Sequence, residues 1–147
     1  ALDVTVQAQI LELFTELCRT LDMALLLVTH DVGVADQIGD EVAVMYAGRI
    51  VERGPSNELL DAPTHPYTKA LLASLPQPGV ARGELRSIPG RAVLAGEALT
   101  GCPFAPRCVQ AVDDCRHVEP ALISVGPRRA AACSNLLSTD NDAEVMA

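Results

Sequence analysis

The sequence predicts an α/β fold, and three patterns in its first half support this prediction. Apolar residues recur at helical spacing between Val6 and Leu21. A continuous apolar run follows at 24–28, and such a run without alternation is typical of a strand buried on both faces of a parallel sheet. A second helical pattern begins soon after, at Val32. Helix, buried strand and helix in this order are characteristic of an α/β unit.

The first predicted helix carries one apolar face. Its apolar residues lie four, three, one, three and four positions apart: Val6, Ile10, Leu13, Phe14, Leu17 and Leu21. Asp3 and Thr5 are both suited to cap its start, because a side-chain oxygen there accepts a hydrogen bond from an early backbone N–H. His30 and Asp31 directly follow the predicted strand. We expect them at its carboxyl end, where α/β sheets usually place ligands.

The next elements are a hairpin and two short helices. Apolar segments at 42–46 and 49–52 flank Ala47 and Gly48, and a two-residue turn with glycine predicts an antiparallel hairpin. One helix is predicted to begin after Gly54-Pro55. A second is predicted at Pro66, since proline is favoured in the first turn of a helix, and His65 suits its entry.

Composition and charge narrow the function classes. The 147 residues carry a net charge of −8, which argues against a nucleic-acid-binding protein. No apolar run approaches the roughly 18–20 residues that a membrane span needs. Proline and glycine gather in the segment 76–79, so we place a boundary near 75–80. The acidic residues 138–147 predict a disordered tail.

Several segments, in this order, resemble the C-terminal half of an ABC-transporter ATP-binding subunit. They are Ala-Leu-Asp at 1–3, Val-Thr-His-Asp at 28–31 and the hairpin segment 45–54. The continuations at 63–72, 88–90 and 101–108 are similar to the dipeptide/oligopeptide and nickel importer branch of that family. The resemblance covers Ala1 to about Leu136. It implies that residues 1–75 are the C-terminal portion of a P-loop NTPase domain and that 76–137 are an irregular, cysteine-rich extension.

The resemblance implies catalytic roles for two residues. Asp3 matches the D-loop, which couples the two nucleotide sites across a dimer interface, and His30 matches the switch histidine, which contacts the γ-phosphate of ATP and the attacking water. Phosphoryl transfer needs positioned groups of this kind, and an imidazole can donate or accept a hydrogen bond. From the residues alone, a helix cap explains Asp3, and a core histidine bonded to backbone explains His30.

The sequence contains no G-x-x-x-x-G-K-[ST] motif, the loop that cradles nucleotide phosphates. The first residue is Ala1 rather than methionine, and the resemblance places the Mg²⁺-binding and catalytic carboxylates upstream of it. We therefore expect the chain to be part of a larger subunit and inactive as an ATPase on its own.

Four of the five cysteines form a cluster: Cys102, Cys108, Cys115 and Cys133. Such a cluster indicates a metal site or disulfides. The resemblance implies a [4Fe–4S] cluster in some members. Zinc with four cysteine ligands is the alternative, although a C-x₂₋₄-C knuckle is missing. Two disulfides would suit an exported protein, and unligated thiols remain open.

Charged residues near the cysteines have simpler interpretations. Arg107 and Arg116 are suited to offset the negative charge of a thiolate-ligated cluster. His117 is an alternative ligand, although we expect it to face solvent. The pair Arg128-Arg129 predicts a solvated turn.

The resemblance implies an ATP-hydrolysing subunit, using ATP with Mg²⁺, that energises peptide uptake by an ABC importer. Its implied partners are a second ATP-binding subunit, membrane permease subunits and, indirectly, a solute-binding protein. Its implied location is peripheral, on the cytoplasmic face of the cell membrane. The alternative is a stand-alone, non-catalytic interaction module that binds an Fe–S cluster or zinc.

Overall fold

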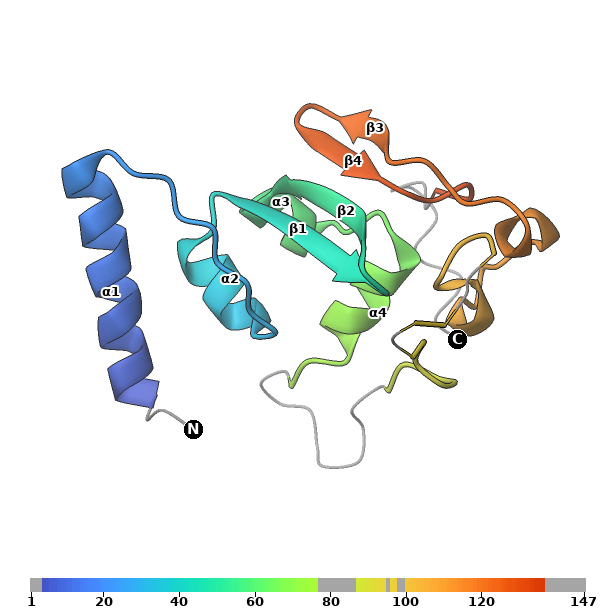
Figure 1. The fold of residues 1–147 in the computed structure, drawn as a ribbon, viewed down its shortest axis with the longest axis horizontal. Helices are drawn as coiled ribbons and strands as arrows, with labels where there is room; N and C mark the ends of the chain where they lie inside the picture. The colour runs from blue at the N-terminus through green and yellow to red at the C-terminus, as the bar shows by residue number, and fades with distance from the viewer. Residues whose placement is uncertain (1–3, 77–86, 95, 98–99, 137–147) are drawn as a thin grey trace. The chain divides into compact units, whose positions relative to one another are not determined.

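The computed structural model describes residues 4–76, 87–94, 96–97 and 100–136 (Figure 1). The chain divides into two units, residues 1–40 and residues 41–147. No helix within the described ranges is long and apolar enough to cross a membrane. Asp3 and the tail predicted at 138–147 lie outside the described residues.

The first unit contains the two predicted helices. Helix α1 spans Val4–Leu21 and helix α2 spans Val32–Ile38. Asp31 caps α2, because its Oδ1 accepts hydrogen bonds from the backbone N–H groups of Gly33 at 2.9 Å and Val34 at 3.3 Å. Both helix predictions are confirmed.

The strand predicted at 24–28 is not formed. These residues have no regular secondary structure, and the side chains of Leu26 and Val28 are 91% and 88% exposed. A strand persists when its backbone N–H and C=O groups pair with a neighbouring strand. The described part of residues 1–40 contains no strand with which this segment could pair. Every strand pair that the structure describes is antiparallel. The parallel sheet is therefore a wrong expectation for this structure.

The second unit is built on a four-stranded antiparallel sheet with the order β1-β2-β4-β3. Strand β1 (Glu41–Tyr46) and strand β2 (Arg49–Pro55) form the predicted hairpin. Its turn residues Ala47 and Gly48 have φ values of 48° and 78°, the left-handed pair that a tight hairpin turn of this class requires. Helices α3 (Ser56–Asp61) and α4 (Pro66–Ala73) follow as predicted.

The extension expected to be irregular contributes two strands to this sheet. Strand β4 (Arg129–Ala131) pairs with β2, and strand β3 (Ile123–Gly126) pairs with β4, as Figure 1 shows. Between residue 100 and these strands lie two short 3₁₀ helices, η1 (Ala105–Arg107) and η2 (Asp113–Arg116). The extension is therefore partly regular.

One core joins the hairpin to the extension. Phe104, from the extension, packs against Tyr46 and Tyr67 with ring centroids 5.4 and 5.3 Å apart. Val51 and Leu59 complete the buried cluster. Residues on both sides of the expected boundary thus share apolar contacts. The boundary itself falls largely on residues 77–86, outside the described ranges, and stays a prediction.

Candidate functional site

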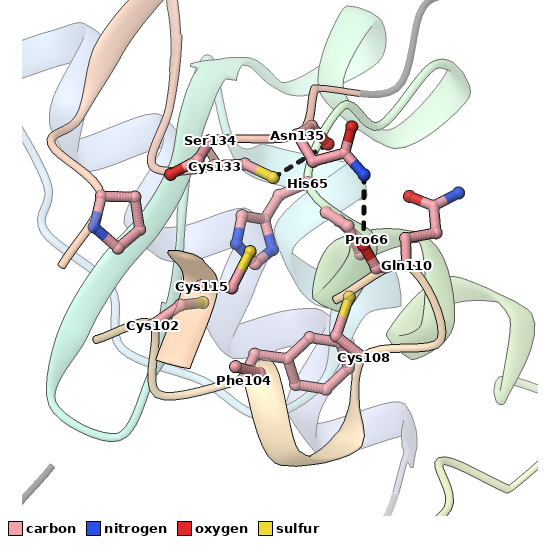
Figure 2. A pocket seen from close by; sticks show the side chains of 12 residues that line it. His65, Pro66, Cys102, Phe104, Cys108, Gln110, Cys115, Cys133, Ser134 and Asn135 are labelled. Carbon is pink, nitrogen blue, oxygen red and sulfur yellow. Dashed lines mark hydrogen bonds between the residues drawn. The ribbon is translucent and has the colours of Figure 1, made fainter. Parts of the chain in front are cut away.

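The four clustered cysteines line one pocket in the second unit (Figure 2). Cys133 is 31 positions from Cys102 in the sequence, so the fold, rather than local spacing, brings these thiols together. His65 and Phe104 line the same pocket. The cysteines are all free thiols, so the disulfide alternative is not realised.

A backbone contact that needs glycine brings Cys102 to Cys115. The N–H of Cys102 donates a hydrogen bond to the carbonyl oxygen of Cys115 at 2.8 Å. Gly101 has a φ of 72°, and a Cβ at this position would lie 2.5 Å from the same carbonyl oxygen. Only glycine combines this left-handed conformation with so close an approach.

The other two cysteines are placed by the elements beside them. Helix η1 turns the chain between Cys102 and Cys108, since the N–H of Ala105 donates to the Cys102 carbonyl at 3.0 Å. Cys133 follows β4, and the N–H of Ala132 donates to the Val51 carbonyl at 2.8 Å, which holds this segment on β2. The Sγ of Cys133 donates to the carbonyl oxygen of Asn135 at 3.1 Å.

Burial raises the pKa of three pocket thiols and so favours their protonated form. It raises the pKa of Cys102 and Cys108 and raises the pKa of Cys133 to about 11, with a further contribution from the neighbouring thiols. Thiolates crowded in a half-buried pocket repel one another. A bound cation reverses this balance because it stabilises the thiolate form.

The four cysteines are chemically suitable metal ligands, but the structure does not arrange them as a metal site. Cysteine sulfur is the soft ligand preferred by zinc and by iron–sulfur clusters. Among the residues that the structure describes, however, no group of three or more His, Cys, Asp or Glu side chains has the arrangement of a metal site. The structure thus gathers the four predicted ligands without forming the predicted metal site.

His65 connects this pocket to helix α4. Its side chain is only 1% exposed, and its Nδ1 caps the helix by accepting a hydrogen bond from the N–H of Tyr67 at 3.0 Å. The predicted place at the helix entry is confirmed. Burial lowers the pKa of His65, while Glu52 and the Ala132 carbonyl raise it to a smaller extent. The sequence analysis missed that this ring faces the cysteines, because no local pattern links it to residues 102–133.

A buried carboxylate fixes the backbone before α4. Glu52 on β2 is 0% exposed, and its two oxygens accept hydrogen bonds from the N–H groups of Thr64 at 2.7 Å and His65 at 3.0 Å. Arg129 on β4 completes the group, with its Nη2 3.4 Å from Glu52 Oε1. Glu52 thereby links the sheet to the wall of the cysteine pocket.

The interpretation of Arg128-Arg129 as a solvated turn is half correct. Arg128 has a φ of 59° and pairs with Glu41 on the surface. The side chain of Arg129 is only 13% exposed and pairs with Glu52. Arg128 lies in the turn before β4, whereas Arg129 is the first residue of β4, whose pairing with β2 places its side chain beside Glu52.

The remaining candidates do not line the pocket. Arg107 donates hydrogen bonds to the carbonyl oxygens of Ile88 and Pro89 at 2.9 and 2.8 Å, so its guanidinium holds a neighbouring segment. His117 is exposed and lies 3.8 Å from Asp113. Arg116 is also exposed.

His30 lies in the first unit and is exposed in the loop directly before Asp31. A buried core histidine is therefore a wrong alternative for it. The capping of α2 by Asp31, and a hydrogen bond from the N–H of Asp31 to Thr29 Oγ1 at 2.9 Å, order the backbone on either side. Asp3 lies outside the described residues.

Part of the second unit matches a known protein family. Residues 51–115 match the family described as the oligopeptide/dipeptide transporter, C-terminal region. This match begins in β2 and ends at Cys115, so it includes His65, Glu52 and three of the four pocket cysteines.

Curated relatives extend the similarity over most of the chain. A Brucella ovis protein named as a peptide import ATP-binding protein is 48% identical over 139 residues, covering 90% of this chain and 41% of that protein. The dipeptide transport ATP-binding protein of Escherichia coli is 44% identical over 133 residues, again covering 90% and 41%. Its Haemophilus influenzae counterpart is 42% identical over 144 residues, covering 98% and 44%.

The chain spans about two fifths of the length of these relatives. Its similarity to proteins named for peptide or dipeptide transport covers 90–98% of the chain. The family match covers most of β2, both short helices and three of the four pocket cysteines. Residues 51–115 are therefore similar to the C-terminal region of oligopeptide/dipeptide transporters.

Proposed function

We propose that the chain is the C-terminal part of an ATP-hydrolysing subunit that energises peptide uptake by an ABC importer. The observation that carries this proposal is the identity of 42–48% to proteins named as peptide or dipeptide transport ATP-binding proteins, across 90–98% of the chain. The family match at 51–115 supports the same assignment. The substrate class is peptides, as the names of these relatives indicate.

His30 is the proposed catalytic residue, with ATP and Mg²⁺ as its nucleotide substrate and metal. Its exposed position is compatible with a contact to the γ-phosphate and the attacking water, because a buried imidazole would be unable to reach them. Asp3 is proposed to couple the two nucleotide sites of a dimer. The Asp31 side chain caps α2 next to His30, which supports an ordered backbone at this position.

The proposed partners follow from the same assignment. They are a second ATP-binding subunit, membrane permease subunits and, indirectly, a solute-binding protein. The subunit is proposed to lie at the cytoplasmic face of the membrane, attached through the permeases.

The test is uptake of a labelled dipeptide by cells in which the gene of the full-length subunit carries His30→Ala. We expect uptake to fall about 10²-fold, the usual loss when one group that stabilises transition-state charge is removed. His117→Ala is the matched control, since this histidine is also exposed but lies in the other unit, and it should leave uptake unchanged. Undiminished uptake in the His30→Ala strain would contradict the proposal and favour a non-catalytic metal-binding module.

We further propose that Cys102, Cys108, Cys115 and Cys133 hold a metal centre that stabilises the extension, a [4Fe–4S] cluster first and zinc as the alternative. The shared pocket and the soft sulfur donors support this. Anaerobically purified protein should be brown, with absorption near ~400 nm, and Cys133→Ser should reduce its iron content while Cys18→Ser should not. Colourless protein containing zinc would establish the alternative. Protein free of both metals would contradict both forms.

A further inference from the structure

The peptide unit that follows His30 is held through both of its neighbours. The N–H of Asp31, which belongs to this unit, donates a hydrogen bond to Thr29 Oγ1 at 2.9 Å. The carboxylate of Asp31 in turn accepts hydrogen bonds from the N–H groups of Gly33 at 2.9 Å and Val34 at 3.3 Å. The backbone after His30 is therefore tied to the Thr29 hydroxyl on one side and to the first turn of α2 on the other (Figure 1).

These bonds control the direction in which the His30 side chain leaves the backbone. A peptide unit is planar, so the bond that holds the Asp31 N–H also holds the His30 carbonyl and restricts the ψ angle of His30. Because His30 is exposed, packing contributes little to its orientation, and its Cα–Cβ bond follows the backbone. Small displacements of a catalytic group are costly, since a shift of about 1 Å can lower a rate about 10²-fold.

We propose that Thr29 is a positioning residue for His30 in ATP hydrolysis. Its hydroxyl accepts the Asp31 N–H and so fixes the backbone from which the imidazole reaches the γ-phosphate and the attacking water. The inference rests on the catalytic role proposed above for His30. The function of Thr29 is that of a hydrogen-bond acceptor, which serine also provides and valine lacks.

Three substitutions in the full-length subunit isolate this hydroxyl. Thr29→Val keeps the β-branched shape and removes the acceptor, whereas Thr29→Ser keeps the acceptor and removes only a methyl group. Thr15→Val is the matched control. The Thr15 hydroxyl also bonds to the backbone of the first unit, but it does so within α1, where it donates to the Leu11 carbonyl at 2.9 Å.

The measurement is ATP hydrolysis by the purified importer complex, with kcat expressed per assembled complex. Thr29→Val should lower kcat about tenfold and leave the KM for ATP within about twofold, because a displaced imidazole loses contacts made in the transition state. Thr29→Ser should recover most of this loss, and Thr15→Val should equal the wild type. In a His30→Ala background, Thr29→Val should cause no further loss, since residues that act through one another are not additive.

The His30→Ala background separates positioning from general support of the loop. An equal loss from Thr29→Val in that background would show that Thr29 acts independently of His30, and this would overturn the inference. It is also overturned by an unchanged kcat in Thr29→Val, by a change confined to KM, by a loss that Thr29→Ser does not recover, or by failure of Thr29→Val to assemble.

The failures of the two proposals are distinguishable. A fully active His30→Ala complex would refute the proposed catalytic role of His30, and the inference about Thr29 with it. A fully active Thr29→Val complex beside an impaired His30→Ala complex would refute the inference about Thr29 alone.

Discussion

Residues 24–28 and residues 42–46 are both short apolar segments that predict a strand, yet only the second forms one. Each residue of strand β1 pairs with a residue 3 to 14 positions further along the chain, because the turn at Ala47-Gly48 returns β2 beside it. The segment 24–28 has no such partner within the described part of its unit, and Leu26 is exposed. Apolar composition therefore marks a possible strand, while a paired backbone makes one.

The two units also differ in what holds them together. The second unit buries an apolar and aromatic cluster together with a charged pair, Glu52 and Arg129. In the first unit, Leu11 and Val34 are the buried apolar side chains among the described residues. Substitutions in the second unit should therefore cost far more stability than equivalent ones in the first.

The largest effect is expected at the buried charge. Glu52→Leu removes the acceptor of two backbone N–H groups and leaves Arg129 without its anion, which should lower the free energy of unfolding by about 3–5 kcal/mol. Urea denaturation followed by circular dichroism measures this. Glu41→Leu is the matched control, because its pair with Arg128 is solvent-exposed and should cost less than about 1 kcal/mol. Equal losses in both variants would contradict a buried network.

The next effect compares one substitution in the two units. Leu59→Ala removes a fully buried side chain from the core and should cost about 2–5 kcal/mol. Leu26→Ala, at an exposed position, should change stability by no more than about 0.5 kcal/mol. The same denaturation experiment measures both, and a loss at Leu26 similar to that at Leu59 would show that residues 24–28 are buried after all.

A smaller effect is expected at the cap of α2. Asp31→Ala removes the acceptor of the N–H groups of Gly33 and Val34 and should destabilise this helix by about 1 kcal/mol. Hydrogen exchange of the α2 amides measures the local change. Asp36→Ala is the control within the same helix, since Asp36 is exposed and lies beyond the first turn. Faster exchange in the control than in Asp31→Ala would contradict the capping role.

The smallest effect concerns pH. The pKa of Cys133 is raised from an ordinary value near 9.0 to about 11, chiefly by burial. As pH rises through this window, the unfolded chain loses the thiol proton while the folded chain keeps it, so the stability of the metal-free protein should fall. Below pH 9 the contribution is fully present. The difference between the urea midpoints at pH 8 and pH 10.5 should be smaller in Cys133→Ser, where the raised pKa values of Cys102 and Cys108 remain, and an unchanged difference would contradict this assignment.

Much of the fold was predictable because its signals are local. The helical spacing from Val6 to Leu21, the turn at Ala47-Gly48 and the proline at 66 each determine an element within a few residues. The cysteine cluster was visible in the same way, as a composition feature of residues 102–133. His65 and Arg129 were assigned to a helix entry and a turn, and neither assignment reveals their burial.

The sequence by itself therefore determined the helices, the hairpin and the four thiols, since backbone propensity and turn geometry act over short distances. Only the tertiary structure decided that residues 24–28 stay unpaired and that Glu52 forms an ion pair with Arg129. It also decided that the His65 ring lines the same pocket as the cysteines. The physical reason is that strand pairing and burial of polar groups depend on residues far apart in the chain. Their partners are chosen by the packed fold and leave no local pattern.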